Sequence, residues 1–360
     1  MDLSELATRV LPILGFLVCI TVVADLSDGL GVFATIARGA SRLARGSVIA
    51  LWLLVVLIAV LATAVLSLDT IAVLLTPVVL ALARQLELDQ AVFAFTAVWL
   101  ANTASLFLPV SNLTNLLAVG ALPGYDVVDF AQLMWPAAVA SVLVTVAVIA
   151  ILFRRSLRGH YRIGPAEPAP HRGLLILATI VCALLGPAFL VGVDVTLASA
   201  VAAAILVVAC AIARRDLLSW RMLPWPLVLG VSVLFVLVQL AHDQGLSTVL
   251  GVAAGQGETW TALLRMAGLG GVGANVLDNL PTYLALEPTA SDSRLRLAAL
   301  LVGVNAGPLI TPWASLATLL WAARCRKAGV SVSWGRFALR GLIVAPLVLV
   351  AAVSALWFVG

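Results

Sequence analysis

Apolar segments separated by short polar stretches make up most of this chain. A helix needs about 20 apolar residues to cross the hydrocarbon core of a bilayer. The pattern predicts membrane spans at about 10–33, 91–119, 131–153, 173–190, 195–213, 225–243, 297–322 and 341–359. We therefore expect an all-α protein that crosses a membrane many times.

Two further apolar segments, 47–83 and 259–290, contain polar residues near their middle. The interruptions read Ser67-Leu68-Asp69-Thr70 and Asn275-Val276-Leu277-Asp278-Asn279-Leu280-Pro281. We interpret both segments as re-entrant hairpins, which enter and leave the membrane on the same side. Non-helical backbone at membrane depth is tolerated only where protein or a water-filled cavity surrounds it.

The distribution of basic residues favours this interpretation, because cytoplasmic loops carry an excess of Lys and Arg. If 47–83 is a cytoplasmic-side hairpin, the loops 120–130, 191–194 and 244–258 face outward, and they contain no Lys or Arg. The basic clusters then all lie inside: Arg38, Arg42, Arg45, Arg84, Arg154, Arg155, Arg158, Arg162, Arg172, Arg214, Arg215, Arg221, Arg324, Arg326, Lys327, Arg336 and Arg340. The basic, proline-rich segment 154–172 is predicted to be a cytoplasmic linker.

Composition excludes a soluble domain: 63% of the residues are hydrophobic, 11% are charged, and the mean hydropathy is +1.15. The four cysteines lack the spacing of a disulfide framework or a metal site. No nucleophile–base pair, phosphate-binding glycine loop or nucleotide motif is present. We expect no enzymatic activity, no cofactor and no nucleic-acid partner. Energy for transport must then come from an ion gradient or from a partner ATPase.

The two halves of the chain contain an internal repeat. Residues 101–117 align without a gap to 304–320, which pairs Asn102 with Asn305 and Pro109 with Pro312. Upstream, Leu68-Asp69-Thr70 lies opposite Leu277-Asp278-Asn279, and Asp28-Gly29-Leu30 lies opposite Asp243-Gln244-Gly245-Leu246. The charge pattern gives the two copies opposite orientations, which is typical of secondary transporters with a site near the midplane.

The predicted domains follow from this repeat. Residues 1–153 form the first repeat, with about three spans and the cytoplasmic-side hairpin 47–83. Residues 173–360 form the second, with about five spans and the outer-side hairpin 259–290. The first repeat is therefore shorter by two spans.

Polar residues and prolines lie inside the two matched spans. Proline removes a backbone donor and clashes with the preceding turn, so both helices are predicted to be broken near the middle. Unwound backbone and Asn, Ser and Thr side chains offer donors and acceptors at membrane depth, although such residues also serve helix–helix contacts. The predicted substrate-binding residues, including those at the hairpin tips, are Thr70, Asn102, Thr103, Ser105, Ser111, Asn112, Thr114, Asn115, Asn279, Thr282, Asn305, Thr311, Ser315 and Thr318.

Asp69 and Asp278 are the only carboxylates deep in the hairpins. A charged side chain near the bilayer centre costs about 2.5–3.5 kcal/mol on insertion scales, so its presence indicates a function. A buried carboxyl group can bind a proton or remain ionised beside a cation, and we predict that both residues couple transport to an ion. The alternative is that each only accepts hydrogen bonds at its hairpin tip. Asp25, Asp28 and Asp243 lie near span ends, where solvation at the interface explains them.

The motifs ANTASLFLPVSNLTNLLAVG, NVLDNLPTYLALEP and GVNAGPLITPWASLATLLW resemble the arsenite/antimonite permeases, the ArsB-type arm of the ion transporter superfamily. The resemblance covers nearly the whole chain. It implies a scaffold-and-transport-domain fold in the cell membrane with opposed hairpin tips at Asp69-Thr70 and Asp278-Asn279 and broken helices at Asn102–Asn115 and Asn305–Thr318. It also implies export of arsenite or antimonite, driven by protons or by a cytoplasmic ATPase.

The chain departs from the family pattern in three places. Family members usually carry two more N-terminal spans. Their first tip more often reads Asn-Asp, where this chain has Leu68-Asp69, and their second tip more often has two asparagines, where this chain has Asp278-Asn279. The last two changes fall in the predicted site.

Three other functions remain open at this stage. A sodium-coupled importer of dicarboxylate or sulfate would belong to the same superfamily, but the polar tracts inside the membrane contain no Lys or Arg to balance a divalent anion. An intramembrane enzyme would need Asp69 and Asp278 within about 5 Å of each other, as in a shared-proton dyad. A purely structural subunit has no use for paired broken helices. The sequence shows no interface that would establish a homodimer, which some relatives form.

Overall fold

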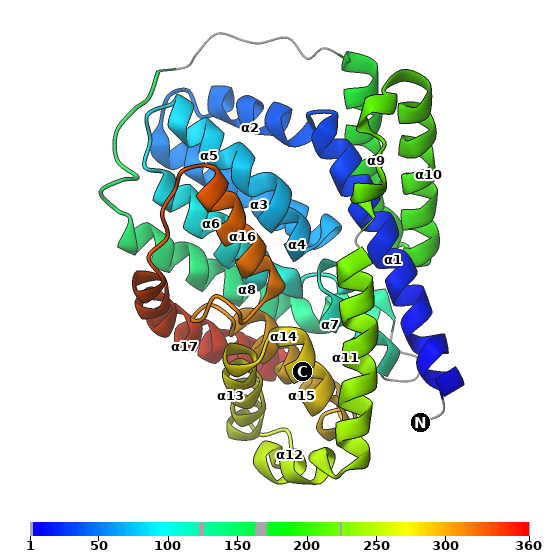
Figure 1. Cartoon of the computed structure of the whole chain (residues 1–360). Coiled ribbons are helices and arrows are strands. Elements are labelled where there is room, and N and C mark those ends of the chain that lie inside the picture. The colour runs from blue at the N-terminus through cyan, green and yellow to red at the C-terminus, as the bar shows by residue number, and fades with distance from the viewer. Residues whose placement is uncertain (1–2, 122–125, 163–170, 224, 360) are drawn as a thin grey trace.

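The computed structural model describes residues 3–121, 126–162, 171–223 and 225–359, and its regular elements in this part are all helices (Figure 1). The first half contains α1 (Leu3–Gly29), α2 (Val32–Leu43), α3 (Val48–Leu66), α4 (Leu68–Thr70), η1 (Ile71–Leu75), α5 (Thr76–Gln85), α6 (Gln90–Thr103), η2 (Ala104–Leu106), η3 (Pro109–Ser111), α7 (Leu113–Ala121) and α8 (Val127–Leu152).

The second half begins with two long helices, α9 (Arg172–Leu190) and α10 (Val195–Ala213), which pack against each other and against α1. It continues with η4 (Arg215–Leu217), η5 (Trp220–Met222), α11 (Trp225–Asp243), α12 (Leu246–Ala254), α13 (Trp260–Val276), α14 (Asn279–Leu286), η6 (Glu287–Thr289), α15 (Arg294–Ala306), α16 (Leu316–Lys327) and α17 (Trp334–Val359).

The elements of the two halves follow the same order. A long helix, α1 or α11, is followed by a glycine with left-handed backbone (Gly31, φ 85°; Gly245, φ 94°), which directly precedes a short helix, α2 or α12. A helix pair, an interrupted helix and a 26-residue helix complete each set. This order is the one that a sequence repeat requires. The boundaries 1–153 and 173–360, and the opposite orientation of the copies, stay predictions.

Seven helices in the described part are long and apolar enough to cross a membrane. The predicted span 10–33 was too long at its end, because α1 stops at Gly29 and the chain turns into α2. The sequence analysis did not predict α2. This helix buries Val32, Phe33 and Ala37 on one face, while Arg42 is exposed on the other.

Both predicted hairpins are paired helices joined by a sharp turn. At the first turn, Ser67 adopts φ 97° between α3 and α4, and α2 packs against both α3 and α5. At the second turn, Leu277 and Asp278 separate α13 from α14, and α12 packs against both of these helices. The two arms of each pair therefore return to one short helix, as expected of a hairpin. Figure 1 shows α4 and α14 close to the centre of the molecule.

The most extensive helix contact, between α13 and α15, is built on glycines. The backbone of Gly303 lies against the backbone of Ala267, and Gly307 lies against Gly271. Small residues four apart allow membrane helices to approach this closely. The contact fixes the first arm of the second hairpin to the interrupted helix of the same half.

The predicted linker 154–172 is described at residues 154–162 and 171–172, and its remaining residues lie outside the described part. The Tyr161 hydroxyl donates to the carbonyl oxygen of Ser41 (2.5 Å), and the Tyr161 amide donates to the carbonyl of Gly46 (2.8 Å). The start of the segment is thus held to the connection between α2 and α3. Its cytoplasmic location stays a prediction.

Candidate functional site

The two interrupted helices break at matching positions of the sequence repeat. In the alignment, α6 ends at Thr103 opposite the end of α15 at Ala306, and α7 begins at Leu113 opposite the start of α16 at Leu316. The residues before these starts, Asn112 and Ser315, share an extended backbone, with φ/ψ of −151°/145° and −149°/145°. Proline at matched positions removes a helical donor in each break. The prediction of two broken helices is therefore confirmed by the backbone.

A cavity of about 700 Å³ lies where these elements meet the hairpin tips. Its walls come from α1, α11, the two turns of the hairpins, and the first turns of α7 and α16. Most of the lining is apolar, including Phe16, Leu116 and Leu320. The polar lining residues are Thr21, Asp25, Ser67, Asp69, Thr70, Asn112, Asp278 and Asn279. None of the described lining residues is Lys or Arg.

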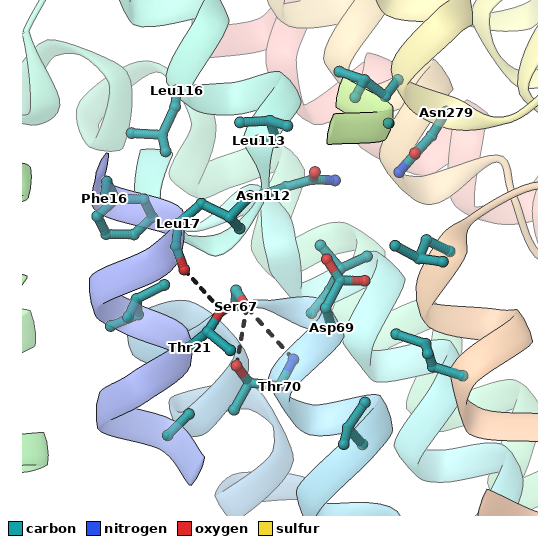
Figure 2. Close-up of a pocket in the computed structure, with 18 of the residues that line it drawn as sticks. Phe16, Leu17, Thr21, Ser67, Asp69, Thr70, Asn112, Leu113, Leu116 and Asn279 are labelled. Carbon is teal, nitrogen blue, oxygen red and sulfur yellow. Dashed lines mark hydrogen bonds between the residues drawn. The ribbon is translucent and has the colours of Figure 1, made fainter. Parts of the chain in front are cut away.

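The hairpin tips present capped helix starts to this cavity. The Ser67 side chain accepts from the Thr70 amide (3.5 Å) and lies 3.2 Å from the Thr70 hydroxyl (Figure 2). At the other tip, the Asp278 carboxylate accepts from the Leu280 amide (3.1 Å). Both arrangements satisfy amides that a helix start leaves unpaired.

Two polar side chains at the tips remain available to a solute. Asn279 is only 6% exposed, lines the cavity, and its side-chain amide bonds to none of the described residues. The Asp69 carboxylate also lines the cavity and forms no ion pair with a described residue. Figure 2 shows Asp69 and Asn112 on one side of Asn279, with Phe16 and Leu17 of α1 beyond them. Buried polar groups normally have partners, so unpaired ones at a cavity indicate a ligand.

A buried hydrogen-bond network joins the two broken helices behind the cavity. The Asn305 side-chain oxygen accepts from the Asn112 amide nitrogen (2.6 Å) and from the Thr114 hydroxyl (3.0 Å). The Asn305 amide nitrogen donates to the Asn115 side-chain oxygen (2.6 Å). Asn115 in turn donates to the carbonyl of Ser105 (2.7 Å) and to that of Leu108 (3.2 Å), which also accepts from the Ser111 amide.

Each unwound segment is also fixed to the hairpin of its own half. The Ser111 hydroxyl donates to the carbonyl of Ala64 near the end of α3 (2.9 Å). In the second half, the Asn275 side-chain oxygen accepts from the Thr311 amide (3.0 Å), and the Asn275 carbonyl accepts from the Trp313 ring nitrogen (2.9 Å). A hairpin and its broken helix are therefore connected as one unit.

The structure brings five of the sixteen predicted site residues to the cavity: Asp69, Thr70, Asn112, Asp278 and Asn279. The other eleven have different surroundings. Thr114, Asn115 and Asn305 belong to the network, and Ser111 and Thr311 bind the hairpins. Asn102, Thr103 and Ser105 donate to carbonyls of their own segment, Ser315 and Thr318 bond to each other, and Thr282 is buried beside Gly273 without a partner for its hydroxyl. Substrate contact by these eleven stays a prediction.

The sequence analysis did not assign three polar residues to the cavity, and it did not assign a role to Asn275, which bonds the second hairpin to its broken helix. Asp25 and Thr21 of α1 line the cavity, although Asp25 also lies near the end of this helix, where the sequence analysis placed it. Ser67 and Asn275 were recognised as part of the interruptions but not as site residues. The positive φ of Ser67 is a backbone property that the sequence does not display. For Asp25, its place four residues after Thr21 on one helix face was the available signal.

The chain is similar to known proteins along nearly its whole length. A family model described as "Arsenical pump membrane protein" (ArsB) matches residues 7–359. The chain belongs to this family. It is therefore a multi-pass protein of the cell membrane and a transporter, not an enzyme.

Individual relatives are similar over most of their length. The arsenical pump membrane protein of Escherichia coli K12 is 29% identical, with 94% of this chain and 84% of the relative covered. A putative arsenical pump membrane protein of Bacillus subtilis is 24% identical, over 99% and 89% of the two chains. Among solved structures, the YdaH transporter of Alcanivorax borkumensis covers 99% of this chain and 89% of its own, with a TM-score of 0.51 and 17% identity. That last likeness concerns the fold alone.

Proposed function

We propose that this protein exports trivalent arsenic or antimony as the neutral hydroxide in exchange for protons. The observation that carries the proposal is the cavity itself, where a carboxylate from each hairpin tip faces the same space without a basic residue among the described lining. The hydroxyl groups of arsenous acid can donate to carboxylates and accept from amides. Asp69, Asp278, Asn112 and Asn279 supply both kinds of partner.

The absence of basic side chains from the described lining favours a neutral solute over a divalent anion. A dicarboxylate or sulfate in this cavity would share it with three carboxyl groups, those of Asp25, Asp69 and Asp278. Like charges in a site of low dielectric repel strongly. A sodium-coupled importer would need bound cations to compensate for all of this charge, whereas an uncharged hydroxide needs none.

Proton exchange is the coupling that the tip carboxylates support best. A carboxyl group that lines a cavity at membrane depth can take up a proton from one side and release it to the other as access alternates. Asp69 and Asp278 come from opposite halves of the chain, so both halves would contribute to each exchange. The names of the relatives agree with the solute, since those from Escherichia coli and Bacillus subtilis are arsenical pump membrane proteins.

Uptake of arsenite into everted membrane vesicles tests the function. We expect arsenite to accumulate when the vesicle interior is made acidic, because protons then leave the vesicle as arsenite enters. This accumulation should be lost when an uncoupler is added. If accumulation instead needs ATP and a cytoplasmic ATPase, ATP hydrolysis and not proton exchange is the energy source, and the coupling part of this proposal is wrong. Sodium-dependent uptake of succinate or sulfate, with no movement of arsenite, would overturn it.

A variant without cysteine is expected to transport arsenite at a rate close to that of the unmodified protein. Trivalent arsenic binds thiolates, but none of Cys19, Cys182, Cys210 and Cys325 lines the cavity. Serine suits the two partly exposed positions, because Cys182 already bonds to Ser27, and alanine suits the two buried ones. Vesicle uptake per amount of protein measures the outcome. A large loss of transport in a variant that is still folded would show that a thiol carries the substrate.

A further inference from the structure

Two asparagines at the same position of the sequence repeat have opposite hydrogen-bonding states. Asn305 is fully buried, and both polar atoms of its side chain are hydrogen-bonded: its oxygen accepts from Asn112 and Thr114, and its nitrogen donates to Asn115. Its partner in the repeat, Asn102, is also buried, at 1% exposure. The two residues therefore sit in comparable places in the two broken helices.

Asn102 lacks the corresponding bonds. Its amide nitrogen donates to the Val98 carbonyl of its own helix (2.9 Å), and its side-chain oxygen is buried without a partner. The residues that the repeat places opposite it are Ser315 and Thr318, which match Asn112 and Asn115. Their hydroxyl oxygens lie 2.9 Å apart and bond to each other. A buried carbonyl oxygen without a donor is unfavourable.

The helices around the two asparagines correspond as well. Asn305 lies at the end of α15, which packs against α7, and Asn102 lies at the end of α6, which packs against α16. In the repeat, α15 matches α6 and α7 matches α16. Only the first of these equivalent helix pairs is closed by a side-chain network in this structure.

We propose that Asn305 and Asn102 are positioning residues for the two access states of the transport cycle. Asn305 holds the state described here. In the state open to the other side, the repeats exchange their conformations: Asn102 accepts from the Ser315 hydroxyl and donates to the Thr318 hydroxyl, as Asn305 does here with Asn112 and Asn115, and Asn305 releases Asn112 and Thr114. Asn112 lines the cavity, so its release alters the site as access changes.

Inverted repeats supply the physical basis. In such transporters, one half rocks against the other around a fixed site, and a two-state element is biased by bonds that exist in one state only. The side-chain oxygen of Asn305 accepts hydrogen bonds here, whereas that of Asn102 has no partner. The bonds to Asn305 are therefore candidates for bonds that exist in one state only. The inference rests on the predicted inverted repeat and not on the identity of the solute.

Opposite shifts in access test the proposal. In the cysteine-free background, a single reporter replaces a cavity residue by Leu116→Cys, and a membrane-impermeant maleimide is applied to intact cells and to everted vesicles. The measured quantity is the ratio of labelling rates from the two sides. Asn305→Leu should change this ratio by roughly tenfold, toward labelling from the side that the present state closes, which is equivalent to about 1.4 kcal/mol. Asn102→Leu should change it in the opposite direction, and the double variant should return toward the starting ratio.

The same labelling assay provides a control variant and the results that would contradict the proposal. Ser199 is a buried residue of α10 whose hydroxyl bonds only within its own helix, to Val195 (2.7 Å), so Ser199→Ala should leave the ratio unchanged. Shifts in the same direction for both asparagine variants, or unchanged ratios in both, would overturn the proposal. Because labelling requires no arsenite, this outcome is independent of the vesicle uptake experiment. A reporter that is labelled in neither orientation would contradict the cavity assignment of Leu116, and Thr21→Cys provides a second reporter on α1.

Discussion

Asp69→Asn is expected to abolish proton-driven accumulation of arsenite while downhill exchange of arsenite remains measurable. Asparagine has nearly the same shape as aspartate and can still bond to hydroxyl groups of the solute, but it cannot take up or release a proton. Asp69 lies at the tip of the first hairpin, lines the cavity and has no described cationic partner that its replacement would leave unpaired. The loss should therefore appear in coupling and not in folding. Everted vesicles with and without a proton gradient measure accumulation, and vesicles preloaded with arsenite measure exchange.

Asp278→Asn separates charge from structure at the other tip. The Asp278 carboxylate accepts from the Leu280 amide at the start of α14, and asparagine caps a helix about as well as aspartate. The hairpin should thus keep its shape while it loses a titratable group. We expect accumulation to fall strongly in this variant also, because both carboxyl groups line one cavity.

A carboxylate outside the cavity provides the control for both variants. Asp194 caps α10 through the Leu197 amide (2.8 Å) and is exposed, so Asp194→Asn should accumulate arsenite as the unmodified protein does. Normal proton-driven accumulation in Asp69→Asn would remove this residue from the coupling mechanism. A loss of exchange together with accumulation would instead indicate that Asp69 binds the solute and does not carry the proton.

The sequence predicted the backbone of the site better than its surface. Proline and asparagine inside an apolar span are unfavourable for a plain membrane helix, so they identify where helices break, and the matched ends at Thr103 and Ala306 agree with that reasoning. The aspartates in the hairpins were likewise found from their cost at membrane depth, and both line the cavity. Both signals depend on how deep a residue lies in the membrane, and this depth can be read from the position of the residue within an apolar segment.

The direction in which a side chain points is a different quantity, and the sequence does not record it. Asn112 lines the cavity, whereas Asn115, three residues later in the same polar tract, binds the carbonyls of Ser105 and Leu108. Broken helices need such internal partners, because every buried backbone group requires a hydrogen bond. Polar residues that complete the break and polar residues that bind a solute are therefore of the same types, and only contacts between segments distant in sequence separate them.

Asp25 is the reverse case: it was not predicted to belong to the site, yet it lines the cavity. It lies near the end of α1, which runs from Leu3 to Gly29, as expected, but it also lines the cavity beside the hairpin tips. The tips come from residues that are more than 40 positions away in sequence. Their approach to α1 depends on how hairpins and broken helices pack, which local pattern does not specify.

Gly303→Leu is expected to prevent the protein from folding into a monodisperse species. A Cβ atom at Gly303 would clash with the backbone carbonyl oxygen of Ala267 in α13, and backbone cannot move aside as a flexible side chain can. Overpacking of a core typically costs about 1–3 kcal/mol and occasionally more, and here the two helices would have to separate along their whole contact. Size-exclusion chromatography in detergent and the yield of membrane-inserted protein measure the result.

Gly268→Leu is the matched control for this prediction. Gly268 belongs to α13, on the same pair of helices, but an added Cβ would meet nothing within 4 Å. Both substitutions add the same side chain and remove the same glycine flexibility from a helix, so only the close approach of α13 and α15 distinguishes them. We expect Gly268→Leu to elute as the unmodified protein does. Equal yields and elution profiles for the two variants would mean that the second hairpin does not depend on this glycine contact for its position. The site would then have to be held by the hydrogen bonds that Asn275 accepts from the Thr311 amide and donates to the Gly307 carbonyl.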